Sequence, residues 1–235
     1  MLARSANYDI SKHVSLINDP RNSYNELYTV QRLGNVVGGE PVLYLNTEIK
    51  TLKDVAIALL KADCPVWFGS DVGKFSNSTQ GLMDPDLYDY EGAFDTKLGM
   101  SKAQRLITGE SMMTHAMVLT AVHLDKDGKP VRWRVENVSA VRLSGAPKCA
   151  HITPMQSWGP DRGEKGYFLM SDSWFDEYCF QIVSPLCLRP IAACSCPHSF
   201  AQAVDRKWVP SKLLKVLDAG NPTELPPWDP MGALA

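Results

Sequence analysis

Residues 115–137 read HAMVLTAVHLDKDGKPVRWRVEN, and this stretch decides the fold. Residues 115–124 and 131–137 are rich in β-branched, aromatic and other strand-forming residues. Between them, Asp125-Lys126-Asp127-Gly128-Lys129-Pro130 supplies turn-forming residues. The stretch therefore predicts an antiparallel β-hairpin.

The hairpin brings two polar residues to its open end. Paired residues of an antiparallel hairpin keep a nearly constant sum of residue numbers, so a turn centred near residues 126–127 pairs His115 with a residue near 137–139. Directly opposed side chains have Cβ atoms roughly 5 Å apart. We therefore expect the carboxamide of Asn137 to accept a hydrogen bond from one imidazole nitrogen of His115, leaving the other for a thiol. Taken alone, such a pair is more often an ordinary polar contact than a catalytic one.

The other elements follow from periodicity. Leu52, Val55, Leu59 and Leu60 lie on one face of a helix predicted over residues 51–61, which Thr51 and Asp54 would cap and Pro65 would end. Residues 75–100 are loop-like, and a short helix is expected over 211–218. Strands are predicted over residues 27–30, 41–45, 66–68, 166–170 and 178–183. The predicted fold class is α+β, with an antiparallel sheet or half-barrel at its centre and flanking helices.

Composition limits the functional classes. The 235 residues are 45% hydrophobic and 21% charged, as in ordinary soluble domains, and the net charge of -2 gives no general attraction to nucleic acid or anionic membranes. Binding to nucleic acid stays open. The chain contains no apolar run of about eighteen residues, so we expect no membrane span. The start of the chain has no signal-like apolar segment, which favours a cytoplasmic location.

The six cysteines are interpreted as free thiols. The alternative is a zinc site made by Cys187, Cys194, Cys196 and His198, whose spacing differs from the usual paired Cys-x2-Cys knuckles. We expect neither a metal nor a cofactor.

Several motifs around the hairpin resemble papain-like cysteine peptidases. Residues 113–117 resemble their histidine strand and residues 133–137 their asparagine strand. Ser157-Trp158-Gly159 and Gly163-Glu164-Lys165-Gly166-Tyr167 resemble the elements that follow that asparagine. The chain is most similar to the bleomycin hydrolase family, and the segments that carry this resemblance are residues 16–21, 67–69, 71–74, 109–117, 172–178 and 227–235.

The resemblance implies a cysteine-type aminopeptidase acting on peptide or amide substrates, in a family that forms homohexamers in the cytosol. His115 would be the base and the ion-pair partner of the thiolate, and Asn137 would orient it. Trp158 would shield the pair from water, and the C-terminal arm ending at Ala235 would lie in the cleft. From the residues alone, a frayed terminus is the alternative for that end.

The nucleophile of such a site is a cysteine at a helix N-terminus, preceded by a glutamine that serves the oxyanion hole. None of the six cysteines has this setting. We therefore predict that the chain, residues 1–235, is the C-terminal part of a papain-like peptidase domain and has no peptidase activity alone. The alternative is a catalytically inactive fragment or splice variant that acts, if at all, as an assembly partner.

Two segments interrupt the resemblance. Residues 138–156 separate Asn137 from Ser157, and residues 184–203 separate Val183 from Val204. Both are rich in Pro, Ser, Ala and Cys and lack periodicity. We interpret them as atypical insertions that arise from splicing.

Overall fold

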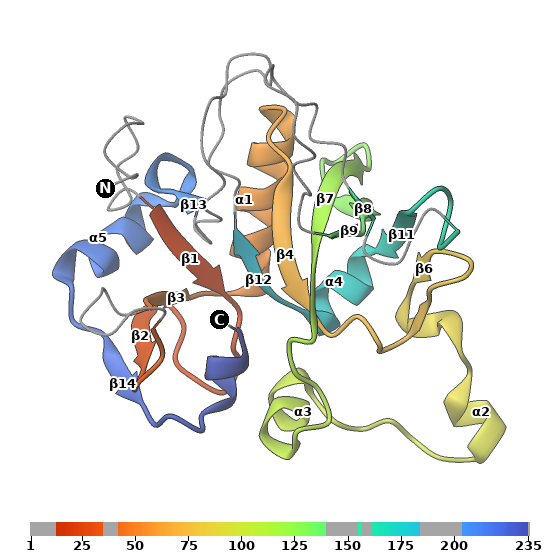
Figure 1. The fold of residues 1–235 in the computed structure, drawn as a ribbon, viewed down its shortest axis with the longest axis horizontal. Coiled ribbons are helices and arrows are strands. Elements are labelled where there is room, and N and C mark those ends of the chain that lie inside the picture. Colours follow the sequence, from red (N-terminus) through yellow and green to blue (C-terminus); the bar gives the residue numbers. More distant parts are fainter. Residues whose placement is uncertain (1–12, 35–41, 140–154, 157–160, 184–203, 235) are drawn as a thin grey trace.

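A mixed β-sheet runs through the computed structural model, which describes residues 13–34, 42–139, 155–156, 161–183 and 204–234 (Figure 1). Its strand order is β14-β2-β3-β1-β12-β4-β7-β8-β11-β6-β5, and β13 also pairs with β1. The strands of this sheet are β1 His13–Ile17, β2 Glu26–Val30, β3 Tyr44–Asn46, β4 Val66–Ser70, β5 Ser76–Asn77, β6 Leu82–Met83, β7 His115–Leu124, β8 Pro130–Glu136, β11 Tyr167–Ser171, β12 Cys179–Val183, β13 Val204–Asp205 and β14 Thr223–Leu225.

The sheet is antiparallel at its centre, as the sequence predicts, but not throughout. From β12 through β4, β7 and β8 to β11, every neighbouring pair is antiparallel. The pairs β1/β3, β14/β2 and β11/β6 are parallel, so the outer parts form a mixed sheet. Each parallel pair joins strands that are separated in the chain by other elements, which strand propensity alone does not reveal.

The predicted hairpin is present as β7 and β8, with Asp125 to Lys129 as its turn. Asp125 accepts hydrogen bonds through its side chain from the backbone amides of Asp127 and Lys129. Val118 pairs with Glu136 and Val122 with Trp133, and a bulge lies between Leu119 and Ala121. This register agrees with the predicted one, because it places residues near 137–139 opposite the start of β7.

Five α-helices and three 3-10 helices accompany the described strands. The α-helices are α1 Ile49–Lys61, α2 Tyr90–Phe94, α3 Lys102–Thr108, α4 Asp172–Tyr178 and α5 Ser211–Ala219. The 3-10 helices are η3 Pro85–Leu87, η5 Arg206–Trp208 and η6 Pro230–Leu234. Residues 75–100, expected to be loop-like, contain β5, β6, η3 and α2, so that expectation was wrong in part.

The predicted cap of α1 was also wrong. The helix begins at Ile49 with Glu48 as N-cap residue, and no side chain caps it. Asp54 instead forms an exposed i,i+4 ion pair with Lys50, at 2.6 Å. The apolar periodicity was read correctly, because Leu52, Val55 and Leu59 are buried.

The larger buried cluster lies between the sheet and the helices α1 and α4, and a smaller one includes Leu106 of α3 and Met231. Lys53 on α1 is also buried and reaches two carboxylates of α4, Asp172 at 2.7 Å and Asp176 at 2.6 Å. The indole of Trp133 on β8 stacks on Phe175 of α4 with ring centroids 5.0 Å apart. These contacts hold both helices against the strands that carry the hairpin. No helix in the described part of the chain is both long enough and apolar enough to cross a bilayer.

Candidate active site

The structure brings His115 and Asn137 together. His115 is the first residue of β7, and Asn137 directly follows β8. The imidazole Nε2 lies 2.9 Å from the carboxamide Oδ1. Because a carboxamide oxygen can only accept, Nε2 carries the proton in this contact, and the lone pair of the neutral ring lies on Nδ1. This is the tautomer that could take a proton from a thiol at Nδ1.

Asn137 is held rigidly for its part in this contact. It is only 1% exposed, and its backbone amide donates to the carbonyl of Gly166 at 3.3 Å. Gly166 has a φ of 83°, which favours glycine. The preceding Glu136 is half-buried, and burial raises the pKa of its carboxyl while nearby Arg134 opposes that effect.

A helix that was not predicted from the sequence, α3, leads into the loop before His115. Helix α3 begins with a capping box between Ser101 and Gln104 and ends at Gly109 in the left-handed region. That Ser-x-x-Gln pattern followed by glycine was the available signal. The half-buried Lys102 fixes the helix in place. Its Nζ donates to Asn18 Oδ1 at 2.8 Å and to the backbone carbonyls of Asp176 and Cys179.

The two cysteines in the described part of the chain, Cys64 and Cys179, are free thiols. Cys64 follows the C-terminus of α1, and Cys179 is the C-cap residue of α4. Burial raises the pKa of the Cys179 thiol to about 12. Cys179 pairs with Ser70 and Ser70 with His115, so one strand separates this thiol from the imidazole. Neither cysteine has the helix N-terminus that would activate it.

The other predicted site residues lie outside the described residues. These are Trp158, Ala235 and the zinc alternative at Cys187 to His198. Within the described residues, no group of three or more potential metal ligands is gathered. The ends of the first predicted insertion are described: β9 Val138–Ser139 pairs with β10 Met155–Gln156, and the outermost pair joins Val138 to Gln156.

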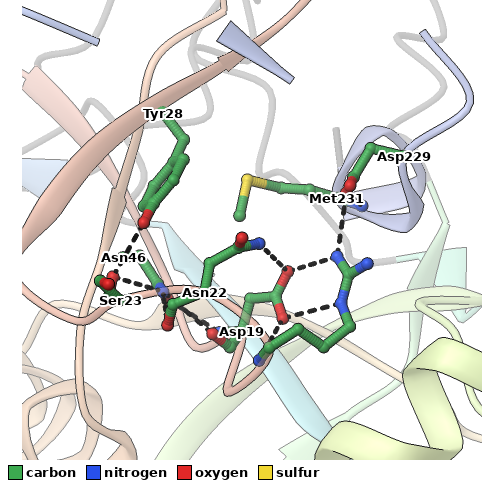
Figure 2. Close-up of polar contacts among 8 residues, drawn as sticks. Asp19, Asn22, Ser23, Tyr28, Asn46, Asp229 and Met231 are labelled. Carbon is green, nitrogen blue, oxygen red and sulfur yellow. Dashed lines mark hydrogen bonds and ion pairs between the residues drawn. The ribbon is translucent and has the colours of Figure 1, made fainter. Parts of the chain in front are cut away.

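The C-terminal segment is anchored as far as Met231 (Figure 2), and the backbone amide of Gly232 donates to the carbonyl of Asp229 at 2.8 Å. The guanidinium of Arg21 binds the fully buried carboxylate of Asp19 and reaches Asp229 at 2.9 Å. Asp229 in turn accepts a hydrogen bond from the backbone amide of Met231 at 2.8 Å. The Met231 side chain is fully buried, so this part of the tail is not frayed.

An α+β fold with a centrally antiparallel sheet, together with a histidine that contacts an asparagine at the open end of its hairpin, is typical of the papain-like class of cysteine peptidases. Comparison with known proteins leads to the same class. The model of the Peptidase C1-like family matches residues 2–186. The chain belongs to this family.

Curated relatives and a solved structure extend the comparison. The chain is 44% identical to human bleomycin hydrolase and 43% identical to aminopeptidase C of Lactococcus lactis subsp. cremoris, in each case over 97% of the chain. The crystal structure of PepW from Lactobacillus rhamnosis matches with a TM-score of 0.76 and 42% identity over 97% of the chain. The chain spans only 42–43% of the length of these three proteins.

Proposed function

We propose that this chain supplies the histidine and asparagine of a thiol-dependent aminopeptidase whose cysteine comes from another part of the enzyme. The observation that carries the proposal is the 2.9 Å contact between His115 Nε2 and Asn137 Oδ1. The names of its relatives, bleomycin hydrolase and aminopeptidase C, support the reaction class.

The proposed chemistry follows from the tautomer. His115 Nδ1 takes the proton of the cysteine thiol, and the thiolate attacks the carbonyl carbon of a peptide or amide bond. The imidazolium returns that proton to the leaving amine as the C–N bond breaks, which leaves a thioester. Water then hydrolyses the thioester with His115 as base. Asn137 keeps the ring oriented through both steps, and Trp158 shields the pair.

The C-terminal arm would supply the preference for substrate N-termini. The carboxylate of Ala235 would bind the substrate's amino group, and the anchoring of Met231 supports such an arm. We further propose a cytoplasmic enzyme that works as a homo-oligomer, a hexamer in the family. Residues 138–156 and 184–203 would be insertions in an otherwise ordinary domain.

A chimera tests the proposed roles. In human bleomycin hydrolase, the matching 42% is replaced by this chain without residues 138–156 and 184–203. We expect turnover of an aminoacyl fluorogenic substrate. His115→Ala should lower kcat/KM by about 10²–10⁴-fold, the usual worth of general acid–base catalysis. Asn137→Ala should cost about tenfold to a hundredfold, as expected for a hydrogen bond to an ionised partner worth about 1.5–3 kcal/mol.

The matched control is His123→Ala, which changes an exposed histidine on the same strand. Its activity should stay at the level of the chimera. Equal losses for the variants at residues 115 and 123 would contradict the catalytic role of His115.

The second candidate is a catalytically inactive fragment that acts as an assembly partner. The inert setting of Cys64 and Cys179 favours it for the chain alone. It predicts no turnover by the purified 235-residue chain, but co-elution with an intact relative on sizing after co-expression.

A further inference from the structure

The buried carboxylate of Asp71 lies beside the candidate site. Asp71 follows the last residue of β4, Ser70, whose Cα is paired with that of His115. It is 4% exposed, and its backbone amide donates to the carbonyl of Tyr178 at 3.0 Å. Burying a carboxylate costs free energy unless hydrogen bonds compensate the lost water. The hydrogen-bond partners of Asp71 therefore indicate which segment it stabilises.

Those partners belong to residues 111–114, the loop that delivers the chain to His115. Asp71 Oδ2 accepts from Ser111 Oγ at 2.8 Å and from the amide of Met112 at 3.4 Å. Asp71 Oδ1 accepts from Thr114 Oγ1 at 3.4 Å. One carboxylate thus binds three of the four residues that precede the histidine.

The remaining residue of the loop also rests on β4. The side chain of Met113 occupies the space that a Cβ at Gly69 would need. The amide of Thr114 donates to the carbonyl of Ser70 at 3.0 Å. Three kinds of contact therefore hold the loop against the end of β4: the backbone of Thr114, the thioether of Met113 and the carboxylate of Asp71.

A second polar contact joins the same two segments but has a different character. Lys74 and Glu110 form an ion pair at 2.6 Å whose side chains are 33% and 56% exposed. Exposed pairs contribute little to stability because water and salt screen them. The buried Asp71 contact is the one able to fix the loop.

We propose that Asp71 is the positioning residue for His115: it fixes residues 111–114 so that the imidazole keeps its contact with Asn137. The inference rests on the proposed function for its biological meaning. A hydrogen bond of 2.9 Å leaves little freedom at the first residue of β7, and a small misplacement of a reacting group costs much of its rate.

The test is nitrogen-resolved NMR of the histidine side chains in the 235-residue chain, with the His115 signal assigned by its loss in His115→Gln. Wild type should show the Nε2-protonated tautomer with a slowly exchanging proton. Asp71→Asn replaces an acceptor by a donor, so both tautomers should appear and proton exchange should accelerate about tenfold. Ser111→Ala, which removes one donor and spares the carboxylate, should show a smaller effect.

A matched control separates positioning from stability. Lys53→Met removes a different buried charged residue, on α1, away from the histidine loop. It should lower the melting temperature without changing the His115 signal. In the chimera, Asp71→Asn should lower kcat about tenfold with KM unchanged, whereas Lys53→Met should change neither.

The outcomes distinguish the two proposals. If wild type lacks the Nε2-protonated tautomer, the His115–Asn137 pair and the proposed function fail together. If wild type has it and both Asp71→Asn and Ser111→Ala keep it with unchanged exchange, the positioning role of Asp71 is overturned and the proposed function stands.

Discussion

At the scale of single residues, the site depends on buried polar groups with satisfied partners. His115 is oriented by the carboxamide of Asn137, and its loop is bound by the carboxylate of Asp71. Lys102 plays a comparable part for α3, since its partly buried ammonium has three oxygen acceptors. Each of these groups loses water on folding, and this makes its partners essential.

The burial of Lys102 predicts how stability depends on pH. Burial lowers the pKa of Lys102 from 10.5 to about 8. Above pH 8 the native state therefore releases a proton that the unfolded chain still holds, and stability rises with pH. Burial of Cys179 raises the pKa of its thiol from 9.0 to about 12, which lowers stability above pH 9. Between pH 8 and 9 the lysine effect is the larger of the two, and a variant that lacks the lysine separates it from the thiol.

Urea unfolding at intervals across this window measures the effect. In wild type, the Lys102 contribution to the free energy of unfolding should rise by up to about 1.4 kcal/mol per pH unit, the limit for one proton. Lys102→Met should lose this slope, whatever its absolute stability. Parallel pH profiles for the two proteins would contradict the prediction.

At the scale of elements, the sequence predicts what is local. The hairpin of β7 and β8 could be predicted because its strand pattern and its turn lie within 23 consecutive residues. The facing of His115 and Asn137 followed from that register alone. The contact of Asp71 with Ser111 joins residues 40 positions apart, and no short pattern encodes it. The cap of α1 was misplaced because the helix begins at Ile49, two residues before Thr51, and no side chain caps it, so no capping pattern marks its start.

The register of two strands supports the proposed insertion of residues 184–203. Leu16 on β1 pairs with Ile182 of β12, and Val14 pairs with Val204 of β13. If the 20 residues of the segment 184–203 are taken out of the count, both pairs belong to one uninterrupted antiparallel ladder. This agreement is what a segment inserted into an existing strand would leave.

Two deletions that differ by one residue test this interpretation. Removal of residues 184–203 should give a folded protein at least as stable as the parent, because the ladder keeps its register. Removal of residues 184–202 shifts β13 by one position and turns the buried Val204 to the opposite face. That variant should melt about 5 °C lower, because it loses the free energy gained by burying one valine side chain. Equal melting temperatures would argue against a single strand.

At the scale of the whole molecule, the two ends of the described chain are tied together. Arg21 lies four residues after the end of β1, and Asp229 lies directly before η6. The two residues are 208 positions apart, and their ion pair is mostly buried. Because Asp19 beneath them is fully buried, Arg21 compensates a carboxylate that water does not reach. The tail is held through this pair and through the buried Met231.

Hydrogen exchange can measure how strongly the tail is held. Asp229→Ala removes the tail's share of the ion pair and the acceptor of the Met231 amide, so exchange at that amide should accelerate at least about tenfold. The control is Asp218→Ala on α5, which breaks the more exposed pair with Arg206 of η5. It should leave the tail unchanged. Unaltered protection at Met231 in Asp229→Ala would show that packing alone anchors the tail.

The pairing of Val138 with Gln156 has a practical consequence. Residues 138 and 156 therefore lie opposite each other, with Cα atoms about 4.5–5.5 Å apart as in any antiparallel pair. Sequence added between these two residues costs only the entropy of closing a longer loop, and that cost grows with the logarithm of the loop length. The β9/β10 pair is therefore a suitable place to insert a reporter peptide or a small domain.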